Sequence, residues 1–126
     1  MKQTLLVLAL CLLAGSTGTA RAQPRSNISG TWLLTVDMGQ THGTPTVVLR
    51  QKGGVLTGTI ANPRGQQMLT GTIDGRDATF AFEAVRDGQT VTGVYRGTVE
   101  SRTKMSGTVD FTGALTGSGT WVATKK

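Results

Sequence analysis

The chain has 126 residues, which suits one small domain, and it carries a formal net charge of +6. The chain has a single cysteine, which excludes an intramolecular disulfide framework. It also has a single histidine, so a zinc site built from several cysteine and histidine ligands is excluded. We therefore expect no metal ion and no cofactor.

The first 22 residues have the pattern of a secretory signal peptide. Lys2 gives a positive start, residues 5–14 form an apolar run, and Ala20-Arg21-Ala22 is a cleavage site of the small-x-small type. The apolar run is too short to span a bilayer as a helix, which favours cleavage over the alternative of an uncleaved anchor. Removing these residues, which include two basic ones and the cysteine, leaves 104 residues and a formal charge of +4. We predict a secreted or periplasmic protein.

After a linker over residues 23–28, residues 29–126 are predicted to form one all-β domain. Apolar residues and glycines alternate with threonines throughout, which is typical of strands with one buried face. Turn sequences rich in Gly, Asp and Asn separate the runs and suit tight antiparallel hairpins. We expect eight strands, over residues 29–38, 44–52, 55–63, 66–74, 77–86, 89–100, 103–111 and 114–124.

The motif Leu-Thr-Gly-Thr occurs at residues 56–59 and again at 69–72. In each copy the leucine and the glycine lie on one face of the strand, and the threonines lie on the other face. The same two-residue alternation places Leu115 and Trp121 on the inner face of the last strand. No amphipathic helix is available to cover the apolar face, so an antiparallel up-and-down meander must close into a β-barrel, with inner glycines where strands bend or need room. The alternatives are a low-complexity repeat rich in Thr and Gly, or a solenoid, and the unequal spacing of the copies argues against a solenoid.

Several short motifs resemble the calycins, the family of lipocalin and avidin barrels. Gly30-Thr31-Trp32 is similar to the Gly-x-Trp signature that opens their first strand, residues 55–59 are similar to the third strand of avidins, and residues 121–125 to their last. The resemblance implies a small exported barrel in which Trp32 plugs the closed end.

The biotin site of avidins does not carry over with this resemblance. Leu34, Ile60 and Asn62 stand where the family has Asn, Tyr and Ser, and the chain has only two tryptophans. A buried ureido group would lose most of its hydrogen-bond partners, which is costly, so we do not expect biotin binding. Trp121 alone is carried over as a pocket residue.

Residues with catalytic chemistry are sparse. No serine lies in a nucleophile-elbow sequence, and the glycine-rich runs do not open a helix as phosphate-binding loops do. The carboxylates fall at strand ends or at outward positions, so a facing pair for acid–base chemistry is not expected. Basic residues are interspersed with acidic ones, which argues against nucleic-acid binding. We predict a protein that is not an enzyme.

In an up-and-down barrel, alternate loops share one end. The loops after the first, third, fifth and seventh predicted strands therefore meet at one rim, which we predict to be the open mouth. The wall below it is predicted to consist of Leu34, Ile60, Phe82, Tyr95 and Phe111. The candidate ligand-binding residues, including Trp121 from the resemblance, are His42, Asn62, Arg64, Arg86, Tyr95, Phe111 and Trp121. The arginines would meet an anionic or polar head group. Alternatively, the apolar side chains simply fill the barrel.

Two functions follow from these alternatives. The first is an exported barrel that binds a small apolar or amphipathic ligand at its open end. The second is a filled barrel that acts as an interaction, inhibitor or accessory module for another protein of the bacterial cell envelope. Threonine-rich outer surfaces would also allow a homo-oligomer, whereas we expect no membrane span in the mature form.

Overall fold

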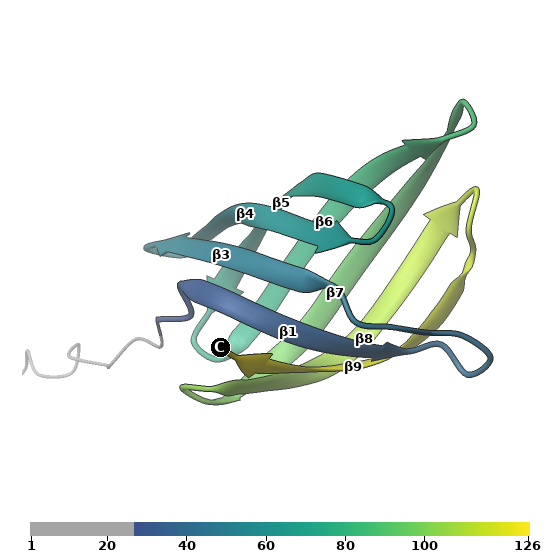
Figure 1. Ribbon diagram of the computed structural model, residues 1–126. Coiled ribbons are helices and arrows are strands. Elements are labelled where there is room, and N and C mark those ends of the chain that lie inside the picture. Colours follow the sequence, from purple (N-terminus) through teal and green to yellow (C-terminus); the bar gives the residue numbers. More distant parts are fainter. Residues whose placement is uncertain (1–26) are drawn as a thin grey trace, which may run out of the picture.

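The computed structural model describes residues 27–126 (Figure 1). The predicted signal peptide, residues 1–22, lies outside the described residues. Within them every regular element is a β-strand, and no helix is long and apolar enough to cross a membrane. The strands are β1 (Gly30–Asp37), β2 (His42–Gly43), β3 (Thr46–Lys52), β4 (Val55–Asn62), β5 (Gly65–Asp74), β6 (Asp77–Arg86), β7 (Gln89–Ser101), β8 (Lys104–Gly113) and β9 (Gly117–Lys125).

The strands form a closed antiparallel barrel with meander order. Each long strand pairs with its neighbours along the chain, and β1 pairs with β9 over six residue pairs, from Trp32↔Lys125 to Asp37↔Thr120, which closes the ring. The two-residue β2 pairs only with the end of β1, so the ring itself has eight strands. The predicted fold is confirmed, and β2 is an addition that the sequence did not indicate.

Inward glycines let neighbouring strands approach closely. A Cβ placed on Gly58 would lie 3.2 Å from Leu49 Cα and would collide with the Val48 carbonyl group on β3. Any side chain at such a position would push the two backbones apart. The recurring glycine of the repeat is therefore a requirement of tight barrel closure, as its inward position in the sequence predicts.

The apolar face of the sheet is buried inside the barrel as predicted, with one exception. Leu115, expected on the inner face of the last strand, lies in the turn before β9 and is 50% exposed. Strand β8 continues to Gly113, which takes a positive φ of 94°, and the chain then turns over residues 114–116 before pairing resumes at Gly117. The alternation that places Leu115 inward does not apply in this turn.

One end of the barrel is closed around Trp32. Its side chain is fully buried, and its Nε1 donates a hydrogen bond to the Ile28 carbonyl oxygen at 2.9 Å. Ile28 lies in the predicted linker, yet it is 1% exposed and belongs to the core. The segment before β1 therefore folds over this end and packs on the tryptophan, while Lys125 Nζ lies 5.8 Å from the ring centroid.

Candidate functional site

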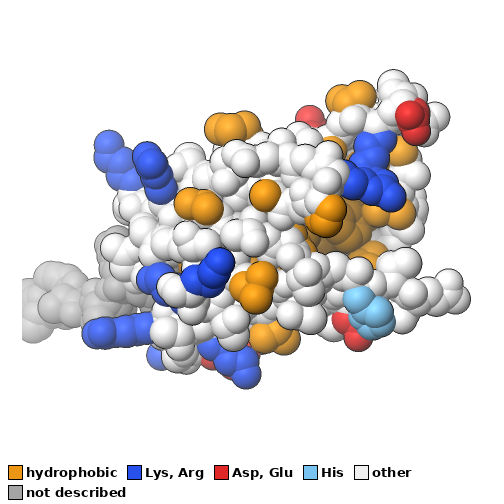
Figure 2. All heavy atoms as spheres, in the orientation of Figure 1, with side chains coloured by type: hydrophobic (Ala, Val, Ile, Leu, Met, Phe, Trp, Pro, Cys, Tyr) orange, Lys and Arg blue, Asp and Glu red, His pale blue; other side chains and the backbone are white. Residues whose placement is uncertain are grey.

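The opposite end of the barrel carries the longer loops and forms a mouth. The connections after β1, β4, β6 and β8 meet there, on the right in Figure 1, whereas the chain end marked C lies at the other end. Figure 2 shows a hollow at the mouth with hydrophobic side chains at its base and basic side chains on its upper edge. The sequence analysis predicts that loops after alternate strands meet at one end, and these loops do.

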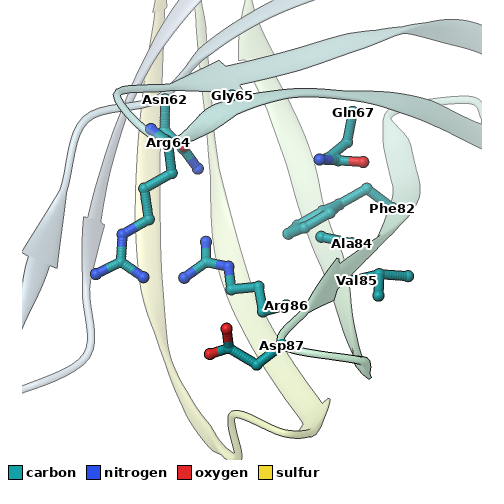
Figure 3. Close-up of a pocket in the computed structure, with 9 residues that line it drawn as sticks. All are labelled: Asn62, Arg64, Gly65, Gln67, Phe82, Ala84, Val85, Arg86 and Asp87. Atoms are coloured by element: carbon teal, nitrogen blue, oxygen red, sulfur yellow. Dashed lines mark hydrogen bonds between the residues drawn. The ribbon is translucent and has the colours of Figure 1, made fainter.

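A cavity of about 310 Å³ opens at this mouth (Figure 3). Its volume lies at the lower end of the range typical of small-molecule sites. It is bounded by the β4–β5 hairpin on one side and the last residues of β6 on the other. Its lining residues are Asn62, Arg64, Gly65, Gln67, Phe82, Ala84, Val85, Arg86 and Asp87.

Two guanidinium groups give the cavity its charge. The side chains of Arg64 and Arg86 both extend across its opening from opposite walls in Figure 3. Neither pairs with a carboxylate among residues 27–126 at salt-bridge distance, although Asp87 also lines the cavity. The Asn62 side-chain oxygen accepts a hydrogen bond from the Arg64 backbone N–H at 2.8 Å, which fixes the hairpin that carries Arg64.

The base of the cavity is aromatic. Phe82 lines it and contacts Phe111 edge-to-face, with ring centroids 6.3 Å apart. Behind them Tyr95 stacks on Phe80, with centroids 5.2 Å apart and planes inclined by 13°, and both rings meet Trp121 edge-on. The cavity therefore offers an apolar surface below two cationic groups, which suits an amphipathic anion.

Below this base the barrel is filled with side chains. Leu34, Tyr95 and Trp121 are each at most 2% exposed, and Ile60 is 4% exposed. Of the wall residues predicted from the sequence, Phe82 reaches the cavity, whereas Leu34 and Ile60 belong to the core. None of these buried residues lines the cavity, which therefore lies at the mouth and does not run along the barrel axis.

The structure brings together only part of the predicted site. Asn62, Arg64 and Arg86 line the cavity, whereas Phe111, Tyr95 and Trp121 lie in the aromatic cluster beneath. His42 lies elsewhere on the rim, with Nδ1 3.5 Å from an Asp37 carboxylate oxygen across the β1–β2 pair, and both side chains are exposed.

Sequence reasoning missed five lining residues. Gln67 and Ala84 fall on the inner face when the alternation is continued from Leu69 and Phe82, so that signal was present. Gly65 and Asp87 belong to the turn sequences of the two hairpins that bound the cavity, and the order of the loops places Asp87 at the mouth, although neither residue was among the predicted ligand-binding residues. No pattern in the sequence marks Val85.

Tyr95 is almost completely buried, and its hydroxyl makes no hydrogen bond within residues 27–126. Burial raises the pKa of Tyr95 from 10.0 to about 12, because the interior disfavours phenolate. The folded state holds this proton more tightly than the unfolded state. The contribution of Tyr95 to stability is thus complete below pH 10 and is lost as pH rises through about 12.

We predict that the free energy of unfolding falls by roughly 2–3 kcal/mol more between pH 9 and pH 12 in the wild type than in Tyr95→Phe. Urea unfolding at several pH values measures this difference. Because phenylalanine removes a hydroxyl that has no protein partner, the variant should be at least as stable as the wild type at pH 7. Parallel pH profiles for the two proteins would contradict the burial of the hydroxyl.

Residues 27–126 contain no group of three or more His, Cys, Asp or Glu side chains arranged to hold a metal ion. Comparison of the chain with protein-family models, with curated proteins and with solved structures finds no match. The case for a function therefore depends on the geometry of the mouth.

Proposed function

We propose that this protein is an exported, non-enzymatic β-barrel of calycin type that binds a small amphipathic ligand at its open end. The observation that carries the proposal is the mouth cavity, where Arg64 and Arg86 extend above Phe82 without a carboxylate partner in residues 27–126. The proposed ligand has an acidic group for the arginines and an apolar body for the aromatic base.

The filled interior sets the size of this ligand. A long acyl chain running down the barrel axis would have to displace Tyr95 and Trp121, which are packed against Phe80. Close-packed cores resist such insertion, because each added methylene strains its neighbours. A compact ligand that stays in the mouth needs no such rearrangement, so the proposal favours a flat, short molecule.

A second candidate is an interaction module for another envelope protein, or for a second copy of the chain. The observation in its favour is the apolar rim: Val85 is 70% exposed and Leu115 50% exposed, both beside the mouth. Exposed apolar residues bordered by polar ones are a common feature of protein interfaces, and these two residues lie beside the polar groups of the mouth. In this case the loops of the mouth would contact the partner and the cavity would receive one of its side chains.

Native mass spectrometry of the protein purified from the culture medium or periplasm tests the two candidates. A retained molecule of low mass supports the ligand proposal, whereas an empty barrel that co-purifies with a protein supports the second candidate. The measured mass also tests the predicted signal peptide, because the proposal expects a mature chain that starts at Gln23.

Titration with 2-naphthoate, a flat amphipathic anion, measures the role of the two arginines. We expect Arg64→Gln/Arg86→Gln to weaken its binding at least tenfold, since a hydrogen bond to a charged group contributes about 1.5–3 kcal/mol. Binding of the neutral 2-naphthalenemethanol should change little. The matched control is Arg76→Gln/Arg102→Gln, which removes two charges from hairpins at the closed end. An equal loss in both double variants would indicate general electrostatic attraction instead of a site.

A further inference from the structure

The β5–β6 seam opens toward the mouth. Its residue pairs run from Asp74↔Asp77 to Leu69↔Phe82 and stop there. Both strands continue beyond this point, since β5 stays paired with β4 down to Gly65 and β6 stays paired with β7 up to Arg86. The four residues 65–68 thus diverge from the four residues 83–86, and we call the space between them the wedge.

Most other seams stay paired or are bridged by a hydrogen bond near the mouth; β1–β9 pairing ends at Asp37↔Thr120, where β1 itself ends, although β9 continues to Gly117. Pairing in β4–β5 and in β6–β7 runs to the hairpin, and β8–β9 pairing reaches Phe111↔Gly117. The β7–β8 seam ends at Val91↔Gly113, and the Ala114 N–H extends it with a hydrogen bond to the Thr90 carbonyl oxygen. Where β1 and β3 separate, the Leu34 N–H bonds to the Pro45 carbonyl oxygen and β2 then pairs with β1.

Backbone groups of both strands point into the wedge. The Ile73 N–H donates to the Gly54 carbonyl oxygen on the β4 side, so the odd-numbered residues of β5 face β4 and the even-numbered ones face β6. Continuing this alternation places the N–H and C=O groups of Met68 toward those of Glu83. These two residues would be register partners if the seam continued, and both have exposed side chains.

The wedge and the cavity are one space. Gln67 from β5 and Ala84, Val85 and Arg86 from β6 all line the cavity, and Figure 3 shows Gln67 facing Phe82 and Ala84 across it. The cavity is therefore open through the side of the barrel as well as at its mouth. This side of the cavity is bounded by the unpaired edges of β5 and β6.

We infer that the wedge is a side entrance, through which a planar aromatic carboxylate or sulfonate slides between β5 and β6. Its flat face lies on Phe82 and Ala84, its acidic group reaches Arg64 and Arg86, and its edge meets the backbone groups of Met68 and Glu83. This inference rests on the proposed function and adds the route and the shape of the ligand. A tapering gap between two strand edges admits a flat body and excludes a branched one.

A disulfide across the wedge tests the route. Met68→Cys/Glu83→Cys places thiols at the two unpaired positions, and neither residue lines the cavity. We expect the oxidised variant to bind 2-naphthoate at least tenfold more weakly than the same variant after reduction. The control is Thr72→Cys/Thr79→Cys, a register pair of equal parity in the closed part of the seam, where oxidation should leave the affinity unchanged.

The outcomes separate the route from the function. Equal affinity of the oxidised and reduced wedge variant overturns the side entrance and leaves binding at the mouth intact. Failure of the wild type to bind 2-naphthoate, 1-naphthalenesulfonate or any co-purified molecule overturns the proposed function itself.

Amide hydrogen exchange gives a second measurement, which applies whether or not the disulfide forms. In the free wild-type protein, the Met68 and Glu83 amides should exchange at least tenfold faster than the Thr70 and Ala81 amides, which lie in the paired part of the seam. Saturating 2-naphthoate should slow the first two at least tenfold. Equal protection of all four amides without ligand would show that the seam is closed and would overturn the inference.

Discussion

Gly71→Val is expected to cause a large loss of stability. A Cβ at this position would lie 2.6 Å from Phe80 Cα and 2.8 Å from Phe80 Cβ, and closer still to the Thr79 carbonyl oxygen. Backbone atoms of a paired strand cannot yield without separating β5 from β6. We expect the free energy of unfolding to fall by about 3 kcal/mol or more, at the upper end of the overpacking range.

The neighbouring threonine provides the control. Thr72 is exposed on the outer face, and valine has nearly the same shape and a similar preference for strands, so Thr72→Val should change stability by less than about 1 kcal/mol. Gly71→Ala isolates the effect of the Cβ alone, so its loss of stability should lie between those of Gly71→Val and Thr72→Val. Urea unfolding measures all three. Equal midpoints for the two valine variants would reverse the assignment of inner and outer faces.

Trp32→Ala is expected to cause the second large loss of stability. The indole is fully buried at the closed end and its Nε1 donates to the Ile28 carbonyl oxygen, so alanine leaves both a cavity and an unsatisfied acceptor. Core Trp→Ala changes typically cost 3–5 kcal/mol, a large fraction of the stability of a small domain. Because the chain has only two tryptophans, Trp121 fluorescence then reports unfolding of the variant on its own.

Two further variants separate the contributions at the closed end. Trp32→Phe retains an aromatic ring and loses the hydrogen bond to Ile28, so its loss should be intermediate. Lys125→Met removes only the charge above the ring, and cation–π pairs at partly exposed sites contribute about 0.5–1 kcal/mol. A loss in Lys125→Met as large as in Trp32→Ala would contradict the view that burial of the indole closes this end.

Local features of the sequence were sufficient to predict the face on which most residues lie. The alternation of apolar residues with threonine assigned Leu56, Leu69, Tyr95 and Met105 to the inner face, and each is at most 2% exposed. The prediction failed at Leu115, because alternation holds only while the backbone stays extended, and the chain turns there. The two-residue β2 was missed for a related reason: its pairing depends on where the end of β1 lies.

The candidate site was predictable only in part. Asn62, Arg64 and Arg86 share the mouth because loops after alternate strands meet at one end, which is a matter of chain order. Tyr95, Phe111 and Trp121 are aromatic residues on the inner face, so the sequence could not separate a cavity wall from a packed core. Their mutual contacts depend on ring sizes and distances across the barrel.

The sequence by itself determined the closed antiparallel meander, its inner and outer faces and which end holds Arg64 and Arg86. These follow from a two-residue period, short turns and the absence of any helix signal to cover the apolar face, all of which are local. Only the tertiary structure decided that the interior is filled and that β5 and β6 diverge above Leu69 and Phe82. Both features depend on how the volumes of side chains from distant parts of the chain fit the spacing between strands, and a local sequence pattern contains no information about that fit.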